Sequence, residues 1–222
     1  MLFRKSRPRF ALESAIEYNI QHSGLIGGRC INIGCGTSGR YKELLSNFDT
    51  DGIDILEPGS TEMPWRYHQV DAANLHFSDC VFDLAIAIES FEHIERNKQA
   101  MSELARVLKP GGVVVITVPT YWTWIFEFGR HGPNYYTRRT ISKLIANSGL
   151  KVDTLSGCGG AATYIIKLVK SWLSPIGIRI FRRHWWTLID RILGPAFILA
   201  FYLDILLPFL PSNWSVLAHK PE

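Results

Sequence analysis

The chain has 222 residues, of which 20% are charged, and a formal net charge of +4 at pH 7. This length lies within the roughly 200 to 250 residues that one α/β domain can reach, so we expect a single domain over 1–222. The four cysteines form no C-x-x-C pair and no His-containing metal spacing. This excludes a disulfide scaffold, predicts no metal site, and favours reduced thiols in the cytoplasm.

The positive charge is concentrated in two parts of the chain. The basic residues in question are Arg4, Lys5, Arg7 and Arg9, and later Arg179, Arg182, Arg183 and Arg191. Such clusters fit nucleic acid, a membrane surface or an acidic glycan, and also a basic face that is merely solvated. We expect no nucleic-acid partner. The first ten residues lack the apolar stretch of a secretory signal.

Apolar runs of strand length alternate with helical patterns, which predicts an α/β fold with a doubly wound parallel sheet. The expected strands lie near 29–33, 51–55, 66–70, 82–87, 112–118, 151–156 and 214–219. The expected helices lie near 11–22, 38–47, 96–108 and 138–147. A long apolar and aromatic insert at 160–211 interrupts the alternation.

Residues 31–39, INIGCGTSG, follow the first expected strand. Gly34 and Gly36 lack Cβ atoms, so the backbone can turn sharply and approach a ligand closely. The free amides at the start of the next helix would supply donors to an anionic or polar cofactor. Gly34, Gly36 and Gly39 also satisfy the G-x-G-x-x-G pattern of dinucleotide-binding folds, so the loop by itself leaves the cofactor open.

Several segments downstream decide between cofactors. They are GIDI at 52–55, VDA at 70–72, CVFDLA at 80–85, EHI at 92–94 and ELARVLKPGGVVVITVP at 103–119. In this order they resemble class I S-adenosylmethionine-dependent methyltransferases, specifically the small-molecule group with the LKPGG signature. The resemblance covers about residues 29–157. It implies a seven-stranded, mostly parallel sheet with an antiparallel last strand at 214–219, and S-adenosylmethionine as cofactor.

The resemblance also implies the residues that hold the cofactor. They are Asn32, Gly34, Cys35, Gly36, Asp54, Asp71, Ala72 and Glu89. Asp54 ends the second strand, where a carboxylate can accept hydrogen bonds from both ribose hydroxyls. Asp71 and Ala72 fall where the family contacts the adenine amino group. The chain departs from the family at Asn32, usually acidic, and at Ser38, usually glycine; Asn32 can still accept a hydrogen bond from an ammonium group.

Methyl transfer from a sulfonium is an in-line displacement, which mainly requires two reactants to be aligned and shielded from water. A base is needed only for a poorly acidic hydroxyl acceptor. His93 and His131 are the candidate bases, and a structural contact is the alternative for each. The candidate acceptor-binding residues are Tyr121, Trp122, Tyr135 and Tyr136, which follow the fifth strand and fit either an acceptor pocket or ordinary packing.

The insert at 160–211 fits three structures. A spanning helix is disfavoured, because Asp204 would be buried in lipid and the strand after the insert must rejoin the sheet. A pair of interfacial helices would place the basic and Trp residues around 182–186 at the headgroups of a membrane's cytosolic face. A soluble lid or a homodimer contact is the third option. The acceptor is therefore expected to be a small molecule or an amphiphilic, lipid- or saccharide-linked one.

Two other functions are weighed against methyl transfer. A nicotinamide-dependent oxidoreductase explains the glycine spacing, but the chain lacks a recognisable Tyr-x-x-x-Lys pair and the LKPGG turn at 108–112 stays unexplained. A non-catalytic, membrane-associated adaptor that keeps the cofactor fold would explain Asn32 and the apolar insert.

Overall fold

The computed structural model of the protein describes residues 10–37, 39, 41–58, 63–126, 132–181, 185–206 and 210–222. The chain divides into two compact units. Ile16–Ser156 and Trp214–Glu222 form the first, which we name the sheet unit; Met1–Ala15 and Gly157–Asn213 form the second, which we name the hairpin unit. Each unit is described by itself.

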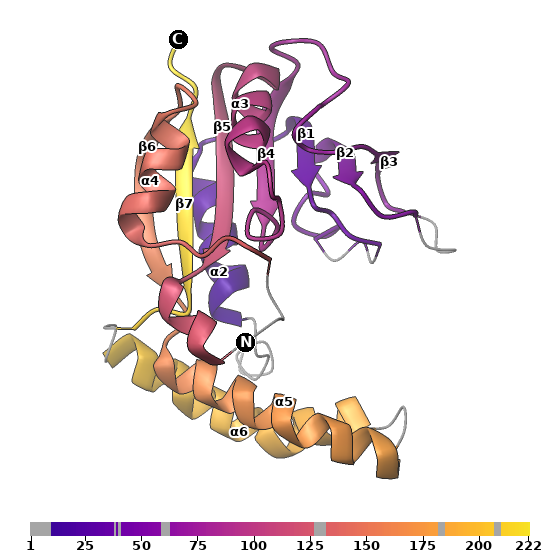
Figure 1. Ribbon diagram of the computed structural model, residues 1–222, viewed down its shortest axis with the longest axis vertical. Helices are drawn as coiled ribbons and strands as arrows, with labels where there is room; N and C mark the ends of the chain where they lie inside the picture. Colours follow the sequence, from indigo (N-terminus) through magenta and orange to yellow (C-terminus); the bar gives the residue numbers. More distant parts are fainter. Residues whose placement is uncertain are drawn as a thin grey trace. The chain divides into compact units, whose positions relative to one another are not determined.

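All seven expected strands are present (Figure 1). They are β1 (Gly28–Ile33), β2 (Phe48–Asp54), β3 (Arg66–Gln69), β4 (Phe82–Ile88), β5 (Leu108–Pro119), β6 (Lys151–Cys158) and β7 (Asn213–His219). Their order in the sheet is β3-β2-β1-β4-β5-β7-β6. β1 pairs in parallel with both β2 and β4, β2 pairs in parallel with β3, and β4 with β5.

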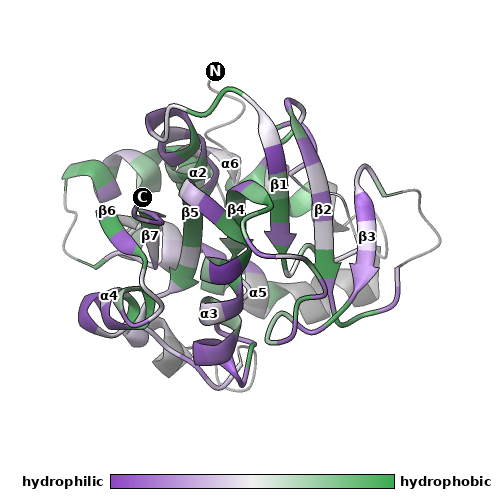
Figure 2. Ribbon diagram, turned by 90° about the horizontal axis from the view of Figure 1, so that it is seen from above, coloured by the Kyte–Doolittle hydropathy of each residue, from purple (hydrophilic) through white to green (hydrophobic). Residues whose placement is uncertain are grey.

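The last strand runs against the others. Gly111 N donates to Lys220 O, and Lys220 N donates to Gly112 O, which joins the β7 end of the chain to the start of β5. The α/β class and the mostly parallel sheet with an antiparallel last strand are therefore confirmed. The central strands β4 and β5 are almost continuously buried and rich in Val, Ile and Ala, because helices cover both faces of such a sheet (Figure 2).

Three of the four expected helices form. They are α2 (Phe10–His22), α3 (Asn97–Val107) and α4 (Arg138–Ala146), and a 3₁₀ turn, η1 (Tyr121–Phe126), follows β5. α4 begins with a capping box in which the Thr137 hydroxyl accepts from Thr140 N and the Thr140 hydroxyl accepts from Thr137 N. α3 buries Met101 and Leu104 in the core of the sheet unit.

A helix was predicted over 38–47, and this prediction was wrong, because the described residues 41–47 do not form one. Residues 41–47 form successive turns, with hydrogen bonds such as Leu45 N to Tyr41 O and Phe48 N to Leu45 O. Leu45 is the only side chain of 41–47 that is fully buried, so the segment has no apolar stripe to stabilise a helix. Ser38 lies outside the described residues.

The insert forms two long helices, α5 (Ala161–Phe181) and α6 (Trp185–Leu206), which contact one another. The side chain of Asp204 on α6 connects the two helices. Its carboxylate accepts hydrogen bonds from the backbone N–H groups of Gly160, Ala162 and Thr163, at 3.0, 2.9 and 3.0 Å. A carboxylate near the C-terminal end of α6 thus caps the N-terminus of α5, where unpaired amides and the helix dipole both favour negative charge.

A side chain at position 160 would not fit this arrangement, because a Cβ on Gly160 would overlap with the Asp204 carboxylate. The base of the hairpin is fixed by a second contact, in which Ser212 N donates to Gly159 O at 3.0 Å. Among the described residues, no helix is both long enough and apolar enough to cross a membrane.

A buried carboxylate ties together the first three strands of the sheet unit. Asp51 on β2 is 1% exposed. It accepts hydrogen bonds from Arg29 on β1 (2.8 Å) and from Arg66 (2.9 and 3.0 Å) and His68 (2.8 Å) on β3. Burial by itself raises the pKa of Asp51, but these hydrogen bonds outweigh it and lower the pKa from 3.8 to about 2.

This lowered pKa predicts an acid-dependent stability. The Asp51 contribution is complete above pH 4 and is lost as the pH falls through about 2. Between pH 5 and pH 2, the free energy of unfolding of the native chain should fall by about 2 kcal/mol more than that of Asp51→Asn. Chemical denaturation at a series of pH values measures this. Asp49→Asn, which removes an exposed partner of Arg66, is the control, and a native profile parallel to that of Asp51→Asn would contradict the prediction.

Candidate active site

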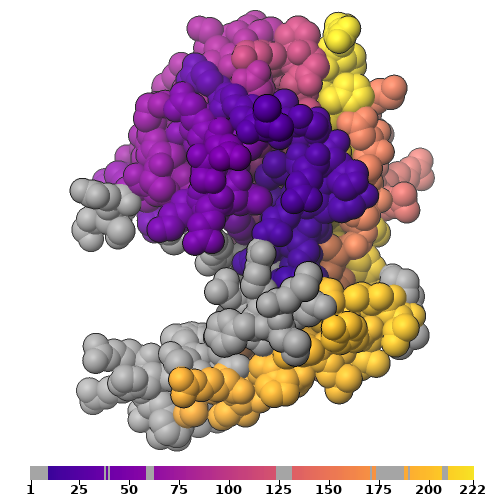
Figure 3. Space-filling view, turned by 180° about the vertical axis from the view of Figure 1, so that it is seen from behind, coloured from indigo at the N-terminus to yellow at the C-terminus, as the bar shows by residue number. Residues whose placement is uncertain are grey.

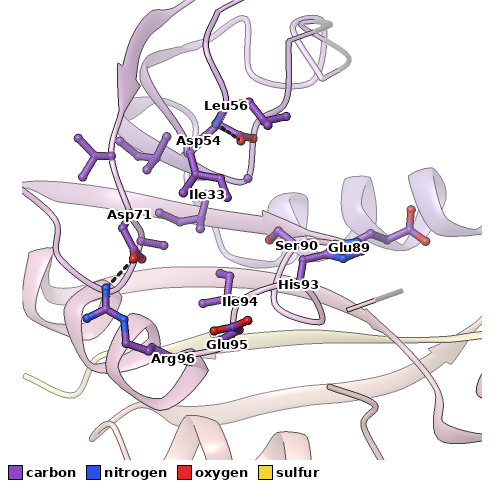
Figure 4. Close-up of a pocket in the computed structure, with 15 residues that line it drawn as sticks. Ile33, Asp54, Leu56, Asp71, Glu89, Ser90, His93, Ile94, Glu95 and Arg96 are labelled. Atoms are coloured by element: carbon purple, nitrogen blue, oxygen red, sulfur yellow. Dashed lines mark hydrogen bonds and ion pairs between the residues drawn. The ribbon is translucent and has the colours of Figure 1, made fainter. Parts of the chain in front are cut away.

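A cavity of about 540 Å³ lies within the sheet unit, at the carboxyl ends of the central parallel strands (Figure 4). Its volume is in the ~300–1,000 Å³ range of small-molecule sites. The residues that line it are Ile33, Gly34, Ile53, Asp54, Ile55, Leu56, Val70, Asp71, Ala72, Glu89, Ser90, His93, Ile94, Glu95 and Arg96. Five of the eight predicted cofactor residues and one candidate base are in this set.

The glycine loop leaves β1 in a conformation that requires glycine at position 34. The backbone N–H groups of Gly34 and Cys35 both donate to Ile53 O, at 2.8 and 3.1 Å, so the loop is bound to the end of β2. Gly34 has a φ of 67° and a Cβ there would overlap with the side chain of Ser90. A larger residue would therefore push β1 and the segment after β4 apart, at the wall of the cavity.

Asp54 holds the other side of this loop. Its carboxylate accepts hydrogen bonds from Gly36 N at 2.8 Å and from Leu56 N at 3.1 Å. A carboxylate has room for about four hydrogen bonds, so Asp54 keeps acceptor capacity toward the cavity that it lines. The predicted ribose ligand is thus at the cavity wall and is also part of the loop's support.

Asp71 and Arg96 form one end of the cavity (Figure 4). One Asp71 oxygen accepts from Ala73 N at 2.7 Å and the other pairs with Arg96 at 2.6 Å. The backbone hydrogen bond from Ala73, and then Arg96, lower the pKa of Asp71. A fixed, ionised carboxylate at this position can accept from a ligand amino group, as the prediction for adenine requires.

Two polar side chains near the loop have donors that no neighbour uses. Asn32 is 2% exposed and Ser90 is 6% exposed, yet the Asn32 amide nitrogen and the Ser90 hydroxyl have no hydrogen-bond partner among the described residues. Buried polar groups are usually satisfied, and the unused hydroxyl of Ser90, which lines the cavity, is suited to a ligand. Asn32 directly precedes Ile33, which also lines the cavity. Cys35 is different: burial raises the pKa of its thiol to about 12, so it stays neutral.

Glu89 adopts a left-handed backbone, with φ at 48°, where β4 ends. This conformation costs a non-glycine residue about 1 kcal/mol or more. Two hydrogen bonds from Glu89 N hold it, one to Thr117 O at 2.9 Å and one to the Thr117 hydroxyl at 3.2 Å. The strain turns the chain away from the sheet and places Glu89 at the cavity.

The ring of His93 lines the cavity and is half exposed. Its Nδ1 accepts a hydrogen bond from Gly132 N at 3.1 Å, and its Nε2 lies 3.9 Å from Oε1 of the buried Glu92. Because Nδ1 acts as an acceptor, the proton of the neutral ring is on Nε2. In this arrangement His93 connects the cavity wall to the segment at Gly132, and it would have to release Gly132 to accept a proton at Nδ1.

The four aromatic residues predicted to bind the acceptor differ in their environments. Tyr136 is 4% exposed in the core, where its hydroxyl donates to Phe91 O and accepts from Asn97. Burial raises the pKa of Tyr136 to about 12. Tyr121 is 57% exposed, and Trp122 and Tyr135 are partly buried. His131, the second candidate base, lies outside the described residues.

Sequence reasoning missed Ser90, Glu95 and Arg96 as lining residues. A usable signal was present, because residues 89–96 follow directly from the carboxyl end of β4, where ligands of open α/β sheets bind. Arg96 was harder to foresee, since its role depends on Asp71, which is 25 positions earlier in the chain. Within the described part of the chain, no group of three metal-ligating side chains is arranged to hold a metal ion.

Comparisons with known proteins agree with this geometry. The family model described as a methyltransferase domain matches residues 5–155. A protein named as a probable S-adenosylmethionine-dependent methyltransferase of Mycolicibacterium smegmatis is 30% identical over 149 residues, which cover 61% of this chain and 57% of that protein. An uncharacterised methyltransferase of Mycobacterium tuberculosis is 32% identical over 83 residues, 37% of this chain and 32% of that protein. The chain therefore spans from 32% to 57% of these relatives' length.

Among solved structures, phosphoethanolamine N-methyltransferase 2 of Haemonchus contortus in complex with S-adenosylmethionine has a TM-score of 0.61 and 16% identity, over 94% of this chain and 53% of that one. At this identity the likeness shows the fold. The sheet order, the glycine loop after β1, the carboxylate at the end of β2 and the one after β3 define a class I S-adenosylmethionine-dependent methyltransferase. The chain belongs to the methyltransferase domain family, whose model covers more than half of its length.

The position of Asp54 generates a binding prediction. Asp54→Ala should weaken S-adenosylmethionine binding by about 1.5 to 3 kcal/mol, because it removes a charged acceptor for the ribose hydroxyls and a support of Gly36. Asp54→Asn can still accept from Gly36 N and should lose less. Isothermal titration measures both variants, and thermal unfolding controls for the fold. Unchanged affinity in a normally melting Asp54→Ala would reject this residue as the ribose ligand.

Proposed function

We propose that this chain transfers a methyl group from S-adenosylmethionine to a small-molecule or amphiphilic, lipid- or saccharide-linked acceptor. The charge of the cavity supports the cofactor most directly. Asp54, Asp71, Glu89 and Glu95 line it, against the single cation Arg96. A cleft of one sign attracts ligands of the opposite sign. It suits a sulfonium and an ammonium group, and it opposes the doubly charged pyrophosphate of a dinucleotide.

The residues present fit the cofactor. Asp54 would accept from the ribose hydroxyls and Asp71 would accept from the adenine amino group. The Asn32 amide, near the end of β1, would hydrogen-bond the amino-acid end of the cofactor, where its unused N–H can donate to the carboxylate. Ile33, Val70 and Ile94 supply apolar surface for a flat base. When bound, S-adenosylmethionine supplies a methyl group on a sulfonium and leaves as a neutral thioether.

The chain's own contribution to the reaction is alignment and exclusion of water. The loop at 34–36 and the strained turn at Glu89 fix the walls of the cavity by backbone hydrogen bonds, so little is left to be ordered when ligands bind. Tyr121, Trp122 and Tyr135 follow β5 and are proposed to contact the acceptor.

The charge of the cavity and the similarity to methyltransferases also count against the two alternative functions, the oxidoreductase and the adaptor. A nicotinamide-dependent oxidoreductase would place pyrophosphate beside the four carboxylates of the cavity. A non-catalytic adaptor was suggested by Asn32 and the apolar insert, but Asn32 can still hydrogen-bond the cofactor, and no other observation favours the adaptor. Four free cysteines, three of them buried, support a reducing compartment such as the cytoplasm.

Calorimetry separates the first two functions. The chain should bind S-adenosylmethionine, and bind its neutral product S-adenosylhomocysteine through the same residues, while a reduced nicotinamide dinucleotide should give no measurable heat of binding at the same concentration. The reason is the net negative charge of the cavity. Binding of the dinucleotide, with none of S-adenosylmethionine, would overturn the proposal. Transfer of labelled methyl groups to cell-extract molecules then tests turnover and excludes the adaptor.

The hydrogen bond from Gly132 to His93 predicts that His93 positions the cavity wall and is not the base. His93→Ala should lower turnover less than tenfold and raise the KM for the acceptor. His93→Gln, whose side-chain oxygen can accept from Gly132 N, should restore most of the loss. A general base contributes about 100-fold or more. A fall of that size, together with loss of an ascending limb in the pH–rate profile, would identify His93 as the base.

A further inference from the structure

The helix α5 of the hairpin unit has a row of exposed apolar side chains. On α5, Ile165, Val169 and Trp172 follow one another at i, i+4 and i+7, a spacing that places them on one face of the helix. Ile165 is 58% and Trp172 is 72% exposed. Leu173 is exposed beside them, and Lys170 on the same helix is partly buried. Large apolar side chains are usually exposed singly, so a row of this kind marks a contact surface.

The second helix repeats the pattern. On α6 the exposed apolar side chains at i, i+7, i+11 and i+14 are Ile192, Leu199, Leu203 and Leu206. Leu206 is 73% exposed. Arg191, also exposed, stands at the start of this stripe. The gold atoms of α6 lie at the surface in the space-filling view (Figure 3). We name the two rows together the apolar stripes.

Charge is distributed unevenly between the two units. The hairpin unit has ten Lys and Arg residues against three Asp and Glu residues, an excess of seven positive charges. The sheet unit has fourteen against seventeen, an excess of three negative charges. One of the three acidic residues in the hairpin unit, Asp204, is used to cap α5. The unit with the apolar stripes is thus also the cationic one.

We infer that the hairpin unit docks on an anionic membrane surface, with the apolar stripes of α5 and α6 inserted among the lipid headgroups. This deepens the proposed function, because an enzyme held there meets amphiphilic acceptors. Apolar side chains contact the acyl boundary, the exposed Trp172 suits the interface, and the excess positive charge of the unit, with the exposed Arg191, attracts anionic headgroups.

Charge and surface chemistry favour this occupant over others. A second copy of the chain would bring two strongly positive units together, which costs free energy through repulsion. A nucleic acid would match the charge, but its phosphates need polar and basic contacts, and the stripes present mainly Ile, Leu, Val and Trp. A lipid surface satisfies both the charge and the apolar side chains.

Flotation of the full chain with vesicles tests the inference. Vesicles contain phosphatidylcholine with about one third phosphatidylglycerol, or phosphatidylcholine alone, and no cofactor is added. The chain should float with the anionic vesicles and much less with the neutral ones. Lys170→Glu with Arg191→Glu should lower the partition coefficient at least about 30-fold, since each basic residue contributes about one decade or slightly less and its replacement is repelled. Trp172→Ala should lower it about tenfold.

The matched control is Arg138→Glu with Arg139→Glu, which makes the same charge change at exposed positions of α4 in the sheet unit. It should leave flotation nearly unchanged. If the native chain stays at the bottom with anionic vesicles, or if the control lowers flotation as much as the hairpin variant, the inference is overturned. Sedimentation velocity and a single-stranded DNA binding assay then show whether a second copy or nucleic acid binds instead. Flotation needs no turnover, so this outcome is independent of the methyl-transfer proposal.

Discussion

The site depends on the position of β1 between two parallel neighbours. β1 is hydrogen-bonded to β2 on one side and to β4 on the other, so all three strands end at the same edge of the sheet. The chain leaves β1 toward β2 and β3, and later returns to the opposite side at β4. Its connections diverge there, and a crevice opens between them. Gly34, Asp54 and Glu89 reach one cavity for this reason, although they are far apart in the sequence.

The strands were predictable because each is a short apolar run bounded by turn residues, and their carboxyl ends indicated Asp54 and Asp71. Tertiary contacts limited the rest. Residues 38–47 have a helical pattern too weak to outweigh the loop geometry. Arg96 reaches the site through a distant carboxylate. The orientation of His93 depends on a backbone amide of a segment that follows β5. No periodicity or local motif encodes such pairs.

The two units have opposite electrostatic characters, and each character suits a different ligand. Carboxylates dominate the cavity of the sheet unit, where a sulfonium is proposed to bind. Basic residues dominate the hairpin unit, where acids are few and one of them, Asp204, caps α5. The modest net charge of the whole chain hides this separation. The basic surface proposed to bind anionic lipid is therefore separate from the acidic cavity proposed to bind the cationic cofactor.

The cap that Asp204 provides has a consequence for the order in which the chain is made. The first amides of α5 emerge from the ribosome more than forty positions before the carboxylate that they bind. Until Asp204 follows, the start of α5 lacks its partner, and helices in proteins owe most of their stability to packing against other elements. The two helices of the hairpin thus become stable together, only after Asp204 has been made, and α6 supplies the cap of the helix made before it.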